Sequence, residues 1–320
     1  MIDDKKLKEF EGKLSGKFVY DDLHKALYAT DASVYRKIPL AVAYPKDHND
    51  LQVLIEFAKS NGVTLIPRTA GTSLAGQCVG DGIVVDVSKH FTNIIAFDEQ
   101  NKTITVEPGV VRDELNLFLK PFGLFFGPNT STSNRCMIGG MVGNNSSGST
   151  SIKYGVTRDK VLQIDGILSD GSKATFKEIS SKDFKIKTQK NTLEGKIYTS
   201  IFNELSQKNI QQEIKDQFPK PSIHRRNTGY AVDELLKKEF DIYRKDQKPH
   251  PIMKKHNLNY VPSQYKTHLE KGGTNAYEGQ RTSSLSEKVL NMIQNAYCSI
   301  NKEWYFTKKI SLVLKYFNAL

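Results

Sequence analysis

Apolar positions in the first part of the chain alternate between short runs and helical spacing. Residues 40–44 are a continuous apolar run that predicts a buried strand. A helix ending at Gly62 is predicted next, with its apolar face formed by Leu51, Leu54, Ile55 and Ala58. Residues 63–66 and 83–87 predict two further buried strands. The pattern is that of a βαβ unit continued by one more strand, so a sheet covered by helices is expected.

Farther along, the pattern changes to antiparallel hairpins. Residues 94–97 and 103–106 flank a polar turn, and residues 161–168 and 174–176 bracket the turn dipeptide at 170–171. Between the two hairpins a helix is predicted that ends near Gly123, with an apolar face formed by Val111, Leu115 and Leu119. The body of the protein is therefore expected to be α+β, with a mixed part followed by an antiparallel part.

Residues 127–155 show no periodicity and are dominated by Gly, Asn, Ser, Thr and Pro. A loop of that length is uncommon inside a compact domain unless it binds something. Disorder is the alternative, but apolar residues inside the segment could pack, as a solvated linker would not need to: Met137, Ile138, Met141 and Val142. We expect a binding loop.

Two runs of small residues could hold a ligand. Residues 67–76 follow a predicted strand, where successive backbone N–H groups can face an anion, and Gly71 and Gly76 permit a positive φ. Alone this is a weak signal, because neither the mononucleotide nor the nicotinamide glycine motif is present and a plain turn would explain it. Residues 139–148 supply a second run of small and amide residues. Two such loops suit a large, flat, phosphate-bearing cofactor.

The order and spacing of several segments resemble a known family. These segments are Tyr44-Pro45, Pro67–Gly76, Val106-Glu107-Pro108-Gly109, Gly127-Pro128 to Gly148, Tyr154-Gly155 with Asp159, and Arg225-Arg226-Asn227-Thr228-Gly229-Tyr230. On them, residues 20–238 resemble the FAD-linked oxidases of the vanillyl-alcohol-oxidase type, in the branch of the glycolate oxidase subunit and D-lactate dehydrogenase. The resemblance implies a flavoprotein with a PCMH-type FAD-binding fold of two α/β subdomains, the first parallel-rich and the second antiparallel.

The resemblance also implies which residues hold FAD. The residues implied to line its pyrophosphate are Arg68, Gly71, Thr72, Ser73 and Gly76, continued by Pro128, Ser131, Ile138, Gly139 and Gly140. Those implied to lie against the flavin are Asn144, Asn145, Ser146 and Gly148. Some relatives carry a histidine in the first loop that links covalently to the flavin, whereas this chain has Thr72 there. A non-covalent, dissociable FAD is therefore expected.

The family's reaction moves a hydride equivalent from C2 of a 2-hydroxy acid to the flavin, which then needs an electron acceptor. A cation for the substrate carboxylate and a base for the hydroxyl proton are required. Within the resembling region the nearby candidates are His224, Arg225, Arg226 and Tyr230. The alternative for the two arginines is an ordinary surface ion pair.

The last quarter of the chain does not continue the pattern. Relatives present a Gly-Ser-Glu-Gly-Thr-Leu segment soon after the equivalent of Leu236, and this chain does not. Basic residues outnumber acidic ones by 33 to 29 in residues 1–240 and by 13 to 6 in residues 241–320. We expect a helical lead-in over 1–35, an FAD-binding domain, incomplete at its C-terminal end, over 36–240, and an unmatched basic tail over 241–320. A truncated FAD-binding module without catalysis is the alternative function, and a basic nucleic-acid-binding protein is a third.

Composition adds little to these choices. The cysteines Cys78, Cys136 and Cys298 are too far apart for a C-x-x-C pair, so neither a disulfide framework nor a metal site is indicated. The N-terminus lacks the apolar run of a secretory signal, and no stretch approaches the roughly 20 apolar residues of a membrane span. We expect a cytoplasmic protein, with peripheral contact to the inner face of the membrane left open. Its expected partners are a small 2-hydroxy acid and an electron acceptor, with no specific nucleic acid.

Overall fold

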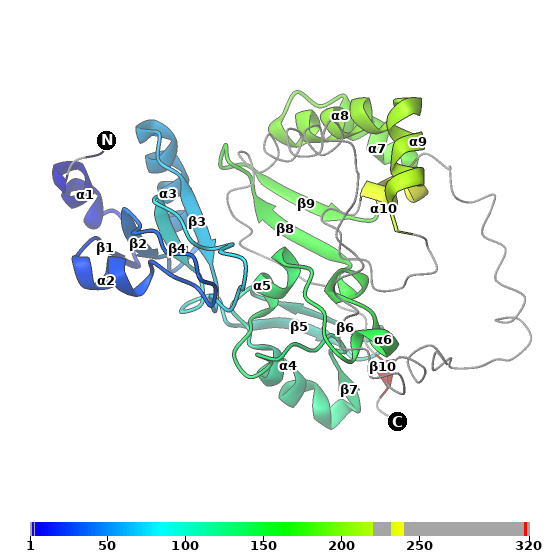
Figure 1. Cartoon of the computed structure of the whole chain (residues 1–320), viewed down its shortest axis with the longest axis horizontal. Helices are drawn as coiled ribbons and strands as arrows, with labels where there is room; N and C mark the ends of the chain where they lie inside the picture. Colours follow the sequence, from blue (N-terminus) through cyan, green and yellow to red (C-terminus); the bar gives the residue numbers. More distant parts are fainter. Residues whose placement is uncertain (1, 3, 220–231, 240–316, 319–320) are drawn as a thin grey trace, which may run out of the picture. The chain divides into compact units, whose positions relative to one another are not determined.

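The computed structural model describes residues 2, 4–219, 232–239 and 317–318. The chain divides into two compact units, and the first runs to Ile179 and includes the two residues near the C-terminus. The second unit begins at Ser180. Figure 1 labels the elements of both units. The domain boundary at residue 240 and, apart from residues 317–318, the unmatched tail over 241–320 lie outside the described residues, so both stay predictions.

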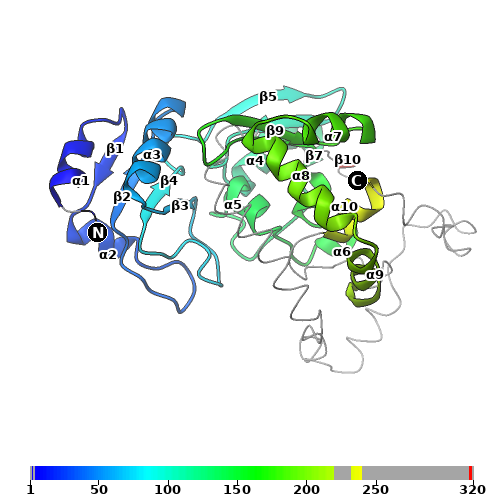
Figure 2. The same cartoon turned by 90° about the horizontal axis from the view of Figure 1, so that it is seen from above.

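The first unit opens with a four-stranded sheet in the order β1-β2-β4-β3 (Figure 2). Its strands are β1 (Lys17–Val19), β2 (Ala41–Tyr44), β3 (Leu65–Arg68) and β4 (Ile83–Asp86). Strands β2, β4 and β3 are parallel, and β1 joins β2 antiparallel at the edge. The predicted parallel-rich part is confirmed, although β3 begins two residues later than the pattern indicated and β1 was not predicted.

Both faces of this sheet are covered, because side chains alternate across each strand. Helices α1 (Asp4–Glu11) and α3 (His48–Asn61) pack on one face, in a core that includes Phe10, Phe18, Ala41, Ala43, Leu51, Leu54, Ile83 and Val85. The other face carries Val42, Tyr44 and Val84, against which Tyr28 packs directly after α2 (Asp22–Leu27). Helix α3 ends at Gly62, as predicted, and Gly62 has the left-handed conformation.

A buried carboxylate joins α1, β1 and α3. Asp50 is 3% exposed and accepts hydrogen bonds from the backbone N–H groups of Ser15, Gly16 and Lys46 at 2.7–2.9 Å. Burial alone would raise the pKa of Asp50, but these hydrogen bonds outweigh it and hold the pKa below its ordinary value. The turn before β1 is thereby fixed to the first turn of α3.

The second part of this unit is built on an antiparallel hairpin, as predicted. Strands β5 (Ile94–Asp98) and β6 (Thr103–Val106) pair, and α4 (Arg112–Leu119) follows. After the short helix η1 (Lys120–Phe122) comes β7 (Leu124–Phe125), which pairs antiparallel with β10 (Phe317–Asn318). The core of this part includes Ile104, Val106, Leu115, Leu119, Phe126, Ile138 and Met141.

Residues 127–155 are more regular than their sequence indicated. They contain α5 (Ile138–Gly143) and α6 (Ser151–Tyr154), and η2 (Thr157–Lys160) follows. Ile138 and Met141 are buried, so the predicted packing of the apolar residues in this segment is confirmed for these two. The unit ends with the predicted hairpin of β8 (Gln163–Ile167) and β9 (Lys173–Lys177). The α+β class, parallel-rich and then antiparallel, is confirmed.

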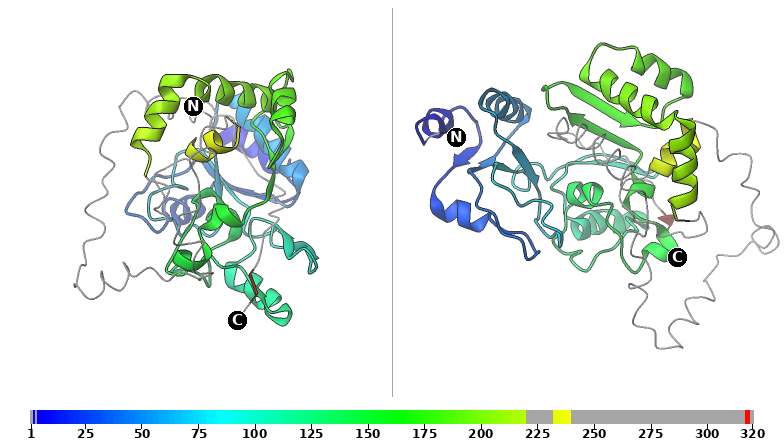
Figure 3. Two further views of the ribbon diagram at one scale, coloured as in Figure 1. Left: turned by 90° about the vertical axis from the view of Figure 1, so that its right-hand side faces the viewer. Right: turned by 45° about the horizontal axis from the view of Figure 1, so that its top comes forward.

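The described part of the second unit is helical (Figure 3). It contains α7 (Ser181–Thr188), α8 (Leu193–Leu205), α9 (Lys208–Gln217) and α10 (Val232–Glu239). Its small core is formed by Leu205, Ile210, Ile214 and Leu236. In the part of the chain that the structure describes, no helix is both long and apolar enough to span a bilayer.

Candidate functional site

The first glycine-rich loop leaves the sheet at the carboxyl end of β3. Five of the predicted site residues lie on it: Arg68, Gly71, Thr72, Ser73 and Gly76. Gly71 and Gly76 have φ values of +65° and +70°, a conformation that favours glycine. Within the described residues, the backbone N–H groups of residues 69–74 have no protein acceptor. Six consecutive donors are therefore available to a ligand.

The far end of this loop is closed by its own side chains. Ser73 Oγ accepts from the backbone N–H groups of Ala75 and Gln77 at 3.2 and 3.4 Å, and it donates to Gln77 Oε1 at 2.5 Å. Leu74 projects outward and is 80% exposed. The Ser73 hydroxyl thus shapes the loop as well as being a possible ligand donor.

The second loop is held at its start by the first turn of α4. Arg112 donates from Nε to Pro128 O at 3.2 Å and from Nη2 to Phe126 O at 3.3 Å, and Nη1 pairs with Asp113 at 2.7 Å. Asp113 in turn accepts from Ser133 Oγ at 2.9 Å. The predicted residue Pro128 is buried, and the predicted residue Ser131 is exposed beyond it.

Helix α5 places the next three predicted residues in different surroundings. Ile138 is buried in the core, so its side chain cannot face a ligand. Gly139 donates to Pro108 O at 2.8 Å, and a Cβ on Gly139 would lie 2.5 Å from Pro108 Cβ. Gly140 is exposed, and a Cβ there would lie 2.7 Å from Thr69 Oγ1 of the first loop. Of the three, only Gly140 opens toward the other loop.

The residues after α5 use their side chains within the protein. Asn144 accepts from Gln77 Nε2 at 2.9 Å and donates to Ser146 Oγ at 3.1 Å. Asn145, at φ 46°, accepts from the backbone N–H of Arg158 at 3.0 Å. The amides that the resemblance sets against the flavin are therefore already engaged, and a flavin would meet mainly backbone and whatever capacity they have left.

Gly148 approaches the segment that follows Pro128. A Cβ on Gly148 would lie 1.7 Å from Asn129 O, so no side chain fits between them. Asn129 Oδ1 is enclosed and has no hydrogen-bond partner among the described residues. An acceptor without a partner is costly in a folded protein and is the kind of group that a bound donor satisfies. Asn129 therefore joins the candidate site, although the sequence did not single it out.

The structure brings the two loops together. The Gln77–Asn144 hydrogen bond and the approach of Gly140 to Thr69 both join the first loop to α5 and the residue after it. Sequence reasoning missed Thr69, Gln77 and Arg112, since Thr69 and Gln77 act through contacts between segments far apart in the chain. The row of N–H donors, the open glycine and the unpartnered amide oxygen fit a phosphate-bearing cofactor with polar ring atoms.

A partly buried polar network lies at the carboxyl ends of β3 and β4. Tyr28 donates to Asp86 at 2.5 Å, and the Arg68 guanidinium lies 5.0 Å from the centre of the Tyr28 ring. Burial raises the pKa of Tyr28, and the hydrogen bond to Asp86 raises it further. Burial likewise raises the pKa of the Cys78 thiol, which lies beside Asp31. The Tyr28 phenol and the Cys78 thiol are therefore neutral near pH 7, and Arg68 places a cation at the start of the first loop.

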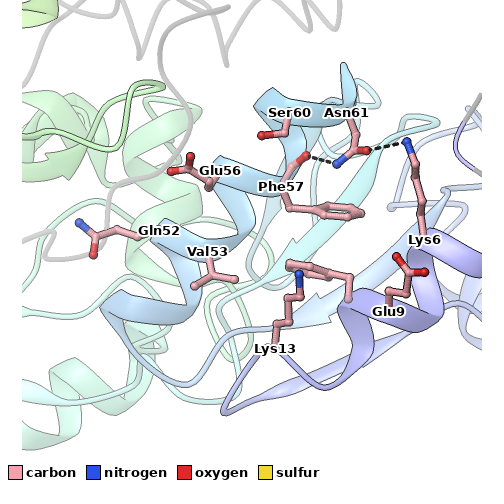
Figure 4. A pocket seen from close by; sticks show the side chains of 10 residues that line it. Lys6, Glu9, Lys13, Gln52, Val53, Glu56, Phe57, Ser60 and Asn61 are labelled. Atoms are coloured by element: carbon pink, nitrogen blue, oxygen red, sulfur yellow. Dashed lines mark hydrogen bonds between the residues drawn. The ribbon is translucent and has the colours of Figure 1, made fainter.

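A separate hollow lies between α1 and α3 (Figure 4). It has a volume of about 480 Å³, and the stacked rings of Phe10 and Phe57, 4.0 Å apart, lie in it. Lys6, Glu9, Lys13 and Glu56 surround these rings. None of the predicted site residues lines it, so it is distinct from the glycine-rich loops.

The predicted substrate-binding candidates cannot be placed. Arg225, Arg226 and Tyr230, together with His224, lie outside the described residues. Their assignment stays a prediction.

A comparison with known protein families covers both glycine-rich loops. Residues 39–176 match a family model described as an FAD binding domain. The D-2-hydroxyglutarate dehydrogenase of Escherichia coli (strain K12) is 35% identical over 222 residues, which are 68% of this chain and 21% of that protein. The glycolate oxidase subunit GlcD of Bacillus subtilis (strain 168) is 34% identical over 171 residues, 52% of this chain and 36% of that protein.

Two further similarities are more distant in sequence. The mitochondrial D-lactate dehydrogenase [cytochrome] 1 of Saccharomyces cerevisiae is 30% identical over 138 residues, 42% of this chain and 23% of that protein. A solved alkyldihydroxyacetonephosphate synthase aligns with 56% of this chain and 38% of its own at 18% identity and a TM-score of 0.49. The chain spans about a fifth of the dehydrogenase from Escherichia coli. Residues 39–176 of this chain therefore form an FAD binding domain of the PCMH type.

Proposed function

We propose that this chain binds FAD non-covalently and oxidises a small 2-hydroxy acid. The observation that carries the proposal is the row of unpartnered N–H groups over residues 69–74, which faces no protein acceptor and is joined to α5 through Gln77 and Asn144. A pyrophosphate needs such a set of fixed donors. Thr72 offers no imidazole for a covalent link, which supports a dissociable cofactor.

Each predicted loop residue has a role in this proposal. The backbone of Gly71, Thr72 and Ser73 would hold the phosphates, and Gly140 would leave room for the cofactor beside Thr69. Asn129 Oδ1 would accept a hydrogen bond from the cofactor. Bound FAD would supply the acceptor for the hydride equivalent from C2 of the substrate. We assign the substrate carboxylate to Arg225 or Arg226 and a polar contact to Tyr230, as predictions.

An enzyme is favoured over an FAD-binding module without activity. The similar proteins named above are a D-2-hydroxyglutarate dehydrogenase, a glycolate oxidase subunit and a D-lactate dehydrogenase, which all act on 2-hydroxy acids by name. They differ in substrate, so D-2-hydroxyglutarate, D-lactate and glycolate form the panel to test.

The first experiment is the visible absorbance of the purified chain after FAD is added and the excess removed. The expected result is a retained flavin spectrum that bleaches when one of the three acids is added without an electron acceptor, and turnover of that acid once an artificial acceptor is supplied. A folded chain that retains no flavin would refute the proposal. Retained flavin that none of the three acids bleaches would support FAD binding and refute oxidation of these acids.

A pair of glycine variants tests the site itself. Gly140→Leu should weaken FAD binding at least about tenfold, because its side chain enters the space beside Thr69. Gly143→Leu is the control. Gly143 lies on the same helix, and a Cβ there would have no neighbouring atom within 4 Å. Equal FAD affinity in the two variants would remove α5 from the site.

A further inference from the structure

A short segment in front of the matched region packs against the first glycine-rich loop. Residues 28–37 precede the family match, which begins at residue 39. The segment folds back on itself, because Thr30 and Arg36 form an antiparallel bridge and the Lys37 N–H donates to Ala29 O at 2.9 Å. It is therefore a closed structure of its own rather than an extended lead-in.

The segment holds the side chain at the start of the loop. Arg68 Nη1 donates to Thr30 O at 2.7 Å, and the guanidinium lies over the ring of Tyr28. The Arg68 guanidinium is thus committed to two groups of this segment. It forms a fixed positive charge next to the N–H row, instead of a free fork that could close on a phosphate.

The segment also contacts both left-handed glycines of the loop. Ala32 N–H donates to Gly71 O at 3.1 Å, and a Cβ on Gly71 would lie 2.5 Å from Arg68 Nη2. The ring of Tyr35 lies against Gly76, where a Cβ would be 2.8 Å from Tyr35 Cδ2. Only glycine fits at these two positions, because Arg68 and Tyr35 occupy the space that a side chain would need.

We propose that residues 28–37 form the rear support of the phosphate-binding loop, and that Tyr35 is a positioning residue for the phosphates of the cofactor. This inference rests on the proposed function. Tyr35 lies against the loop with its ring and its Cβ and is 58% exposed, so it contributes little to the core. Its ring keeps Gly76 in place and thereby sets the direction of the N–H groups of residues 69–74.

The test compares three variants of the full chain. Tyr35→Ala should bind FAD and ADP about tenfold more weakly than the unchanged chain, because ligand binding would then have to order the loop. Tyr35→Phe keeps the ring and should bind normally. Val34→Ala removes a neighbouring side chain that is 95% exposed and should also bind normally. The melting temperatures of all three should stay unchanged, which separates positioning from general stability.

Hydrogen exchange without any flavin makes the test independent of the proposed function. Peptides covering residues 70–80 should exchange faster in Tyr35→Ala than in Val34→Ala, since Val79 N–H, which donates to Gly76 O at 3.1 Å, loses its support. Unchanged exchange there, or unchanged FAD affinity in Tyr35→Ala, would overturn the inference. A chain that binds no FAD but shows the exchange difference would instead refute the proposed function and retain the support.

Discussion

Replacing Asp50 by Asn should destabilise the first compact unit. Oδ1 of Asp50 accepts from Ser15 N–H at 2.8 Å, and Oδ2 accepts from Gly16 at 2.9 Å and Lys46 at 2.7 Å. In Asn one of these two positions becomes an NH₂ group, and its best orientation turns that donor toward Ser15. The Ser15 backbone N–H then loses its acceptor, and the other two bonds lose their charge.

The loss should be about 3 kcal/mol near pH 7, because one hydrogen bond to a charged group, which contributes roughly 1.5–3 kcal/mol, is lost and the other two become neutral bonds of about half the strength. For a unit of this size that corresponds to a fall in the melting temperature of roughly 6–12 °C. Thermal unfolding followed by far-UV circular dichroism measures it. Asp47→Asn is the matched control, because Asp47 caps the same helix from an exposed position and Asn caps equally well.

The difference should depend on pH in one direction. The folded pKa of Asp50 is lowered, so its stabilisation is fully present above the unfolded pKa of about 3.9 and is lost as the pH falls through the lower folded value. The unchanged chain and Asp50→Asn should therefore converge in stability as the pH drops below about 4. A variant as stable as Asp47→Asn near pH 7, or a difference that persists unchanged in acid, would refute this account.

Two further perturbations test the supports of the loops. Tyr28→Phe should lower the free energy of unfolding by about 1–3 kcal/mol near pH 7, because the buried Asp86 loses a hydroxyl donor. The pKa of Tyr28 is raised in the folded chain, so this stabilisation is present below about pH 10 and is lost above it. Urea titrations should therefore show the two chains becoming equally stable above about pH 10. Arg112→Met should weaken FAD binding about tenfold, because the carbonyl groups of Phe126 and Pro128 lose their hydrogen-bond donor. Arg135→Met, at an exposed position of the second loop, is the control and should leave FAD affinity unchanged. Equal FAD affinities in the two variants would contradict a role for α4.

The order of strands and helices was predictable where the apolar period was strong. The runs at β2 and β4 and the helix ended by Gly62 required no tertiary information, because each is a local pattern with a clear stop. Strand β1 is only three residues long and lies at the sheet edge, which leaves too little pattern to detect. Register and neighbour order were likewise out of reach, since β3 lies beyond β4 although it precedes it in the chain.

Helix α5 shows a different reason for failure. Its sequence contains Gly139, Gly140 and Gly143, and glycine disfavours a helix by about 1 kcal/mol each relative to alanine. The helix exists because Ile138 and Met141 are buried in the core beside α4. Packing between segments thus overrides local preference, and a loop was the reasonable expectation from the sequence. The sequence assigned the candidate site to two loops that the structure brings together, but the contact between Gln77 and Asn144 could not be foreseen.

The glycines of the two loops are required for different structural reasons. Gly71 and Gly76 make room for Arg68 and Tyr35, and Gly139 and Gly148 make room for backbone or proline atoms of the protein itself. A glycine-rich pattern therefore marks close packing of the loops first, and ligand contact only where a glycine remains exposed, as at Gly140. The more specific sign of a phosphate site is the row of N–H groups without protein acceptors, because it leaves six consecutive donors for a ligand in a loop held on both sides. Substitutions of these four glycines should therefore impair the loops before they report on any ligand, which is why Gly140 is the position to test.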